Sequence, residues 1–559
     1  MPFLWVLLLL LAGCTARQYQ QQADKSVYRI LDHAEQQALG TNTAFSIERP
    51  EGPVDWKNLH PPELIQDRLA TNERTISLDE AIDLAIANSR RYQTEKERLY
   101  LTALTLTGER YNFQPHPFAS TSLELDRLSN GDRLGAVRSR AGVSQVLKTG
   151  GSLSVNLAND LLRYYTGDPR KSAVSVVSVN LLQPILRGFG KNNPAVEALT
   201  QAERNVIYAT RNYSYFQDSY AVEIVSDYFN LLALKDTVRN RYTNYFGRVQ
   251  ARERSEARSV DRESSVSVNQ ARQAELSARN NYVNSVAGYL GALDQFKIEL
   301  GIPVGMKLHL EDEPLYALQN NGLIPVRIEK DLAYAFATES QMQILNAIDR
   351  FEDAKRKIQV SKNRLLPDLN IFADASLASD GPTDYTNFDP DNIRAGAGIE
   401  LNLPIDRLRE RNNYRATLIS FDAEIRTLTL ALDTLKDSIE RGLRTLEQRR
   451  QSYEIQKGAL EVANNRVTGA TLGIQAGRVE MRELVEAQDA QIAAQNAVTS
   501  ALVSYQDAYL RLMLDVGVLV TDTAQFWLKD HIAAVVPPPA TLDQDPFLKG
   551  ELLAPEDVF

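Results

Sequence analysis

The stretch FDAEIRTLTLALDTLKDSIERGLRTLEQ, residues 421–448, carries its apolar residues at helical spacing. They recur mostly at intervals of four and three residues, at Phe421, Ile425, Leu428, Leu432, Leu435, Ile439, Leu443 and Leu446. This spacing places apolar side chains along one seam of a helix, where a second helix can pack. The stretch therefore predicts a long helix in a coiled coil.

Proline is absent from two long stretches of the chain, one of which contains this seam. No proline occurs from residue 405 to 536, or from 195 to 302, although the chain has 22 prolines in 559 residues. Because a proline inside a helix costs about 3 kcal/mol, these gaps predict continuous helical hairpins over 190–301 and 405–517. The 73 residues from Pro404 to Gly477 would extend about 110 Å as a helix, which exceeds any ordinary globular domain.

The chain contains an internal repeat. ISLDEAIDLAIANS, residues 76–89, aligns with VRIEKDLAYAFATES, residues 326–340, at an offset of 250 residues, whereas Pro184 aligns with Pro404 at an offset of 220. The first copy therefore carries 30 extra residues between these two points. The sequence pattern of each copy predicts a helix, a β segment, a very long helix, a hairpin tip and a return helix, in this order.

In the β segments apolar and polar residues alternate, as in GSLSVNLAN (151–159) and GIELNLP (398–404). A transmembrane β-barrel strand has this pattern, and so does a soluble antiparallel sheet with one wet face. The tight turn KTGG (148–151) and the long polar loop 378–392 favour the barrel. Strands are expected at about 118–127, 136–147, 151–162, 172–183, 368–377 and 393–403.

These strands are too few to close a barrel alone. An open strand edge cannot face lipid, because unpaired backbone groups cost several kcal/mol each there. We therefore expect a mostly α-helical fold with a β segment, in which duplicated helical hairpins form a tunnel and the strands contribute to a barrel shared by several chains.

The N-terminus predicts export and lipidation. Residues 3–13 are almost all apolar, a length that fits a signal peptide (1–13) rather than a transmembrane helix of about 20 residues. Leu11-Ala12-Gly13-Cys14 resembles a bacterial lipobox, in which the thiol receives a diacylglycerol. The alternative is a plain secretory signal in which Cys14, the only cysteine, is incidental. Residues 27–40 predict a short amphipathic helix.

The order of these features resembles the TolC-type outer-membrane efflux family, and its lipoprotein branch in particular. The resemblance covers residues 75–525 and includes NLPI at 402–405 and QAGRVEMRELVEAQ at 475–488. It implies a homotrimer with a shared β-barrel in the outer membrane and an α-helical tunnel in the periplasm, closed at its far tip. It also implies a periplasmic adaptor and an inner-membrane transporter as partners, with no catalysis and no cofactor.

This resemblance gives a domain plan. The expected parts are a signal peptide (1–13), a lipidated extension packed on the tunnel exterior (14–74), a first repeat (75–303, with strands over 118–183), a linker (304–325), a second repeat (326–520, with strands over 368–403) and a partly disordered C-terminal extension (521–559). Family members usually contribute two strands per copy to a twelve-stranded barrel. The extra residues of the first copy are therefore either an added hairpin or part of a larger barrel.

The tunnel tip is the candidate site. Glu483 and Glu486 are three residues apart on one helix and match the acidic positions that constrict the entrance in family members. Three chains would bring six carboxylates around one axis, a ring that favours cations; the alternative is a solvated helix face. Arg478 and Arg482 are expected to pair with these acids, or with Asp261 and Glu263 of the other tip. Adaptor contacts are expected at the hairpin tips, at Ala257, Arg258, Asp261, Gly477 and Arg478.

Other functions find little support in the sequence. The net charge of −10 argues against a nucleic-acid partner. GFGKNN, residues 188–193, lacks the residues of a phosphate-binding loop, and the five histidines have no metal-ligand spacing. Two alternatives to tripartite efflux stay open: the outer-membrane duct of a type I protein secretion system, and a periplasmic coiled-coil scaffold without a pore.

Overall fold

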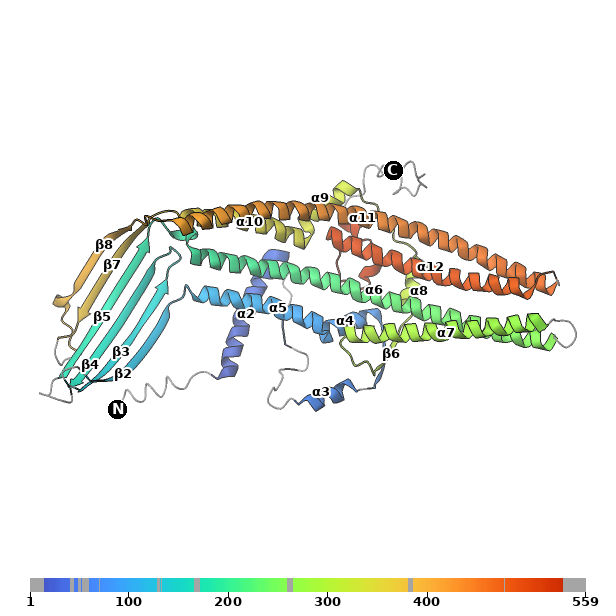
Figure 1. The fold of residues 1–559 in the computed structure, drawn as a ribbon, viewed down its shortest axis with the longest axis horizontal. Helices are drawn as coiled ribbons and strands as arrows, with labels where there is room; N and C mark the ends of the chain where they lie inside the picture. The colour runs from blue at the N-terminus through green and yellow to red at the C-terminus, as the bar shows by residue number, and fades with distance from the viewer. Residues whose placement is uncertain are drawn as a thin grey trace. The chain divides into compact units, whose positions relative to one another are not determined.

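The computed structural model describes residues 15–40, 45–48, 52, 60–69, 71–127, 131, 133–164, 171–258, 265–380, 386–476 and 478–535. Cys14, the expected signal peptide and the tail from residue 536 lie outside these residues. The described chain is mostly helical with a six-stranded sheet, as the sequence predicts (Figure 1). None of its helices is both long and apolar enough to cross a membrane.

Both long hairpins are present as nearly unbroken helices. The first consists of α6 (Pro194–Arg258) and α7 (Ser265–Glu299), and the second of α11 (Leu408–Gln475) and α12 (Met481–Val516). The shorter helices are α2 (Ala16–Leu39), α3 (Pro61–Arg68), α4 (Leu78–Asn88), α5 (Arg90–Tyr111), α8 (Glu313–Asn321), α9 (Lys330–Ser340), α10 (Met342–Asn363) and α13 (His531–Val535).

The chain forms two compact units, each of which takes segments from both repeats. One contains the residues up to Phe45, Arg98–Arg211 and Asn346–Thr429, and the other contains Ser46–Glu97, Asn212–Leu345 and the residues from Leu430 onward.

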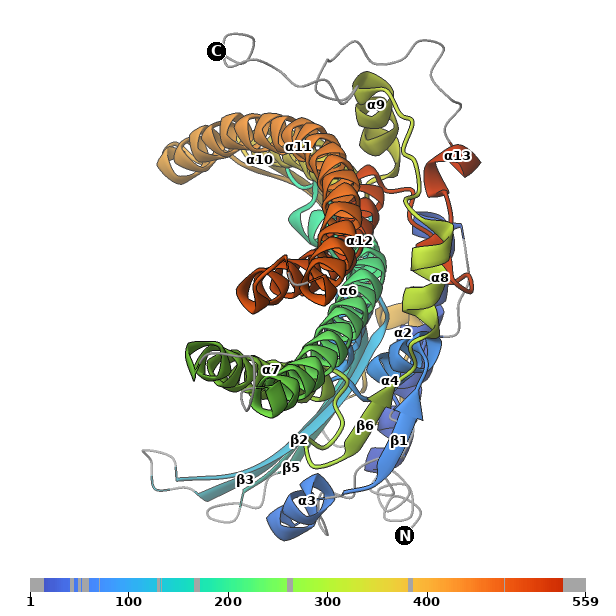
Figure 2. The same ribbon diagram turned by 90° about the vertical axis from the view of Figure 1, so that its right-hand side faces the viewer.

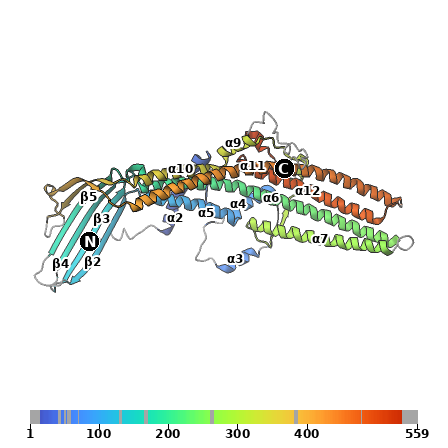
Figure 3. The ribbon, with the colours of Figure 1, turned by 45° about the horizontal axis from the view of Figure 1, so that its top comes forward.

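The first unit contains the six-stranded sheet. Its strands are β2 (His116–Arg127), β3 (Arg133–Val146), β4 (Ser152–Tyr164), β5 (Lys171–Pro184), β7 (Asp368–Ala378) and β8 (Arg394–Asn402). Each strand lies within three residues of its expected bounds. All neighbours are antiparallel, in the order β2-β3-β4-β5-β7-β8, so the strands lie side by side in chain order (Figures 1 and 3).

The helix α2 also belongs to the first unit and is longer than the sequence indicates. It begins at Ala16, whereas the apolar pattern that predicted it begins at residue 27. Only its second half carries apolar residues to bury, among them Val27 and Leu31. Tyr28 of α2 contacts the ring of Tyr100 on α5 at 6.1 Å, and the Tyr100 hydroxyl donates a hydrogen bond of 2.6 Å to Asp24. This polar contact supports the first half of α2.

The core of the second unit lies between α6 and α12. Tyr220, Tyr228, Tyr505 and Tyr509 are among its largest fully buried side chains. The Tyr228 hydroxyl lies 3.0 Å from the carbonyl oxygens of Ile76 and Glu311, next to a small parallel sheet of β1 (Glu73–Ile76) and β6 (Lys307–Leu310). The sequence did not indicate this sheet, because its two strands are short and far apart along the chain.

The apolar seam of residues 421–448 is partly buried in the second unit. Leu435, Ile439, Leu443 and Leu446 are buried on α11. After α12, Phe526, Trp527 and Ile532 are buried in the same core. In this unit α7, α6, α12 and α11 follow one another along an arc (Figure 2).

Candidate functional site

The tip of the second hairpin is built around a glycine. The amide of Arg478 donates a hydrogen bond of 2.8 Å to the carbonyl oxygen of Gly473, which turns the chain at the end of α11. A Cβ atom added to Gly473 would lie 2.4 Å from Cγ2 of Val479, so a side chain at this position would displace the turn. Gly477 and Asp261 lie outside the described residues, as does the side chain of Arg258, whereas Ala257 is exposed at the end of α6.

The two acidic side chains of the candidate gate are exposed on the first turns of α12. A carboxylate oxygen of Glu486 lies 3.8 Å from Nε of Arg482, one turn away on the same helix, and its other oxygen lies 3.7 Å from Nη2 of Arg466 on α11. Among the described residues no ion pair is recorded for Glu483 or for Arg478, which is also exposed. Both acids of one chain are thus accessible to solvent and ions.

A buried arginine that the sequence did not single out joins α6 to α12 above this tip. Arg248 is 2 % exposed. Its Nη2 donates hydrogen bonds of 2.8 Å to the carbonyl oxygen of Val485 and to Oδ1 of Asp489, and its Nε donates one of 3.2 Å to Asn244. A buried guanidinium held by charged and backbone acceptors resists separation of the two helices. No periodicity distinguishes this arginine from the exposed ones around it.

A second set of ion pairs joins the arms of the first hairpin. Arg252 on α6 contacts Glu256 at 2.6 Å and Glu275 on α7 at 2.5 Å, and Arg272 on α7 contacts Glu256 at 3.2 Å. Near the hairpin tips, α6, α7 and α12 are therefore linked by charged contacts. Arg466 of α11 adds a contact to Glu486 of α12.

The two faces of the six-stranded sheet differ in charge: one has almost no charged residues, whereas the other carries most of the charges together with a few large apolar residues such as Phe118, Leu182 and Phe372. Directly paired residues of neighbouring strands share a face. On one face the register runs through apolar residues, for example Val143, Val155 and Val179 of β3, β4 and β5. The other large aliphatic residues of this face are Leu123, Leu125, Val137, Leu153, Leu157, Leu161, Val177, Leu181, Leu369, Ile371, Leu377, Ile399 and Leu401.

Polar residues on the apolar face are few. Thr121, Ser139, Asn159 and Ser175 form one row across four strands. They bond to one another, with 3.2 Å between the Thr121 and Ser139 hydroxyls and 2.6 Å from the Asn159 amide to Ser175. Where side chains are described, the charged residues of this face are Arg127 and Arg133, at the strand ends far from the helices.

The opposite face of the sheet carries the other charges. Arg138 and Arg140 of β3 lie there, and Arg138 pairs with Glu124 of β2. Its remaining charged residues are Asp126, Asp160, Asp368, Asp374, Arg394 and Glu400. An antiparallel sheet of 9- to 14-residue strands with one apolar and one charged face meets the requirement for a barrel that separates lipid from water.

Comparisons with known proteins agree with this geometry. Residues 334–518 match the protein family described as Outer membrane efflux protein. These residues form an outer membrane efflux protein domain. The match confirms the resemblance to the outer-membrane efflux family over these residues. No curated protein matches the chain.

Solved outer-membrane channels share the fold of the chain over most of its length. The channel CusC is 12 % identical, with a TM-score of 0.59 over 79 % of this chain and 92 % of CusC. CmeC of Campylobacter jejuni is 14 % identical, with a TM-score of 0.58 over 79 % and 85 % of the two chains. VceC of Vibrio cholerae is 15 % identical, with a TM-score of 0.58 over 79 % and 96 %. At these identities the likeness concerns the fold.

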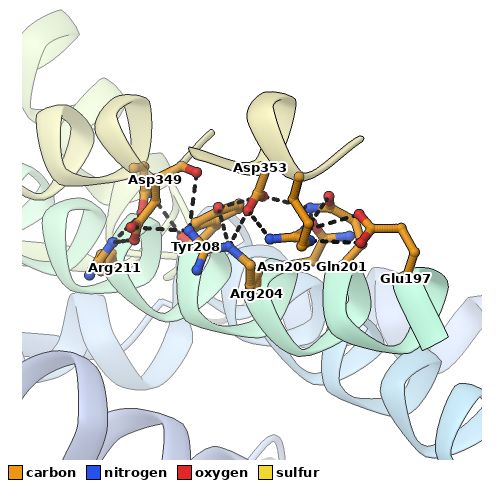
Figure 4. Close-up of polar contacts among 10 residues, drawn as sticks. Glu197, Gln201, Arg204, Asn205, Tyr208, Arg211, Asp349 and Asp353 are labelled. Atoms are coloured by element: carbon orange, nitrogen blue, oxygen red, sulfur yellow. Dashed lines mark hydrogen bonds and ion pairs between the residues drawn. The ribbon is translucent and has the colours of Figure 1, made fainter. Parts of the chain in front are cut away.

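In the first unit, α10, which lies in the matched domain, is joined to α6, which precedes that domain in the chain, by a dense polar network (Figure 4). Asp353 of α10 is 2 % exposed and accepts hydrogen bonds from Tyr208 (2.6 Å), Arg356 (2.8 Å) and Gln201 (3.0 Å). Burial alone would raise the pKa of Asp353, but these donors and the charge of Arg204 outweigh it and lower that pKa.

The same network continues along α6 and α10. Arg211 of α6 pairs with Asp349 of α10 at 2.6 Å (Figure 4). Arg356 of α10 contacts Glu197 of α6 at 2.7 Å. In the part of the chain that the structure describes, no three metal-ligating side chains gather in one place. The hydrogen bonds and ion pairs of the network hold α10 against α6.

Proposed function

We propose that this chain is the outer-membrane channel of a tripartite export system. It acts as a passive homotrimeric conduit from the periplasm to the exterior, and it docks with a periplasmic adaptor and an inner-membrane transporter. The single observation that carries this proposal is the sheet with one apolar and one charged face. Its polar face lines a water-filled passage, and its apolar face contacts lipid.

Exposed apolar stripes on the helices support self-assembly. On α7, Leu276, Val283 and Leu290 follow one another at intervals of seven residues and are 59 %, 54 % and 50 % exposed. On α11, Ile455 and Val462 are likewise seven apart, and 66 % and 69 % exposed. Such stripes match the heptad spacing of a coiled-coil seam. A second copy of the chain covers them in the proposed trimer, where α7 of one copy meets α11 of the next.

In this trimer the tip forms the periplasmic gate. Glu483 and Glu486 of three chains surround one axis, with Arg482 beside them, and the ring selects cations and is blocked by them. The adaptor docks on the hairpin tips around Ala257, Arg258, Asp261, Gly477 and Arg478.

The N-terminal extension serves delivery and assembly in this proposal. Cys14 carries the lipid after cleavage of residues 1–13, and α2 packs on the tunnel exterior. The barrel alone is sufficient to hold the protein in the outer membrane, because its apolar face contacts lipid.

The test uses the full chain in a bacterium with an outer membrane, compared with a Cys14→Ala variant that carries a cleavable signal. We expect both proteins to require detergent for extraction and to form ion-conducting pores in planar bilayers. A Cys14→Ala protein that is released without detergent and does not conduct would contradict the proposal and favour the pore-free scaffold.

A further inference from the structure

We infer that three copies of this chain close an eighteen-stranded barrel, whose exit pore admits solutes of macromolecular size. The inference rests on the proposed trimeric channel and concerns the width of its outer portion. One chain contributes six strands to a single sheet. The family resemblance implies four strands per chain.

The two added strands can be identified from the repeat. Pro117 and Pro184 of the first copy align with Pro367 and Pro404 of the second, which places β2 opposite β7 and β5 opposite β8. The first copy has 30 extra residues between these points. The hairpin formed by β3 and β4, over residues 133–164, accounts for them.

This hairpin is built into the middle of the sheet. β3 pairs with β2 along the whole length of β2, and β4 pairs with β5 from Ser152 to Arg163. A hairpin folded over the outside of a barrel, or lying within its lumen, would leave β2 paired directly with β5. Here the added strands separate β2 from β5, so they enlarge the sheet.

The added strands also continue both faces of the sheet without a change of register. Val143 and Val155 lie on the apolar face, whereas Arg138, Asn156 and Asp160 lie on the charged face. Because side chains alternate along a strand, a slip of one residue would bring charged side chains to the apolar face. The added hairpin thus has the same arrangement of apolar and polar side chains on its two faces as the rest of the sheet.

The two free edges of the sheet are suited to pairing with further copies. Among the described strands, β2 and β8 each have a neighbour on one side only. Since six antiparallel strands alternate in direction, β2 and β8 run in opposite directions, and β8 of one copy can pair antiparallel with β2 of the next. Closure removes the unpaired backbone groups that lipid cannot satisfy.

Strand number sets the width of the pore. With strands about 4.8 Å apart and tilted by about 40°, eighteen strands enclose a backbone cylinder about 36 Å across, and twelve enclose one about 24 Å across. When about 5 Å is subtracted for the side chains on each wall, the free width is about 26 Å for eighteen strands and about 14 Å for twelve. Only the wider barrel passes a solute about 20 Å in diameter.

Two neighbouring residues of the added strand β4 provide a matched test. One cysteine is added to the full chain, either at Asn156 on the charged face or at Val155 on the apolar face. The unaltered chain, whose only cysteine is Cys14, gives the background labelling. Cells are treated from outside with a small water-soluble maleimide and with a polyethylene-glycol maleimide about 20 Å across. We expect Asn156→Cys to react with both reagents and Val155→Cys with neither.

Other outcomes overturn the inference. Labelling of both cysteines would place the hairpin outside the barrel wall, and labelling of Asn156→Cys by the small reagent alone would indicate a narrow pore. Retained conductance in planar bilayers checks that each variant is assembled. If conductance is normal but the labelling follows either of these two patterns, the proposed channel stands and its proposed width is refuted. If even the unaltered chain does not conduct, the proposed function itself is refuted. Electron cryomicroscopy of the purified trimer counts the strands directly, and twelve would also refute the inference.

Discussion

The guanidinium of Arg248 on α6 donates a 2.8 Å hydrogen bond to the carboxylate of Asp489 on α12, and the arginine is buried whereas the aspartate side chain is 60 % exposed. The arginine needs this acceptor more than the aspartate needs its donor, because an unpaired charge is costly only when it is removed from water. The link is thus a point at which the two hairpins are held together.

Replacing Arg248 with methionine is expected to loosen α6 from α12. The loss of charge-assisted hydrogen bonds predicts a decrease of about 2 kcal/mol in the free energy of local opening, measured as faster amide hydrogen exchange around residues 244–252. Arg466→Met is the control, because its contact with Glu486 is 3.7 Å long between two side chains that are more than half exposed. That change should cost less than about 0.5 kcal/mol. Equal effects of the two substitutions would show that burial does not matter here.

Replacing Glu483 and Glu486 together with glutamine is expected to weaken block by divalent cations. Six neutral amides would stand where six carboxylates surround the axis of the proposed trimer, so the concentration for half block should rise about tenfold or more, equivalent to about 1.4 kcal/mol. Single-channel recording in planar bilayers measures this. Glu461→Gln changes an exposed acid on α11 away from the tip and should leave block unchanged. Undiminished block in the double variant would dismiss the acidic ring.

The stability of the second unit is expected to decrease as the pH rises through 6. Burial raises the pKa of Asp218 to about 6, with Asp522 adding to the shift and a hydrogen bond from Thr521 opposing it. A carboxyl whose folded pKa lies above its unfolded value contributes stability that is complete below about pH 4 and is lost as pH rises through the folded pKa. The upper limit of this loss is about 3 kcal/mol.

Asp218→Asn should therefore raise the melting temperature at pH 7.5 and reduce the difference between melting at pH 5 and at pH 7.5. Some pH dependence should persist, because burial and the nearby acids Glu223 and Glu299 also raise the pKa of Asp227 to about 6. Asp433→Asn, at an exposed position of α11, serves as the control. A difference that is unchanged in Asp218→Asn would mean that this carboxyl does not titrate in the range.

Tyr208→Phe is expected to destabilise the first unit, because the buried carboxylate of Asp353 loses its 2.6 Å donor (Figure 4). The expected cost is about 1–3 kcal/mol in thermal unfolding. The native pKa of Asp353 is lowered, so its contribution is present above about pH 4 and is lost as pH falls through the native value. The variant should therefore begin acid unfolding at a higher pH than the unaltered chain. Tyr19→Phe, exposed on α2, should change neither measurement.

Local patterns in the sequence were sufficient to locate the long helices and the six strands of the large sheet, but not the short strands β1 and β6. Proline exclusion and apolar spacing are properties of a single segment, and they report which backbone conformation that segment can adopt. The repeat also indicated that the first copy had gained residues in its β segment. Whether these residues formed part of the sheet depended on pairing with β2 and β5, which are separate segments of the chain.

The sequence by itself thus determined the fold class, the order of the long helices and of the strands of the large sheet, and the alternation of side chains along these strands. Only the tertiary structure decided which strands are neighbours, that Arg248 is buried against Asp489, that Arg466 reaches Glu486, and that α10 is held to α6 through Asp353. The physical reason is that the identity of a side chain sets what it can bind. Its partner is set by packing between segments that can be more than 200 residues apart, as Arg248 and Asp489 are.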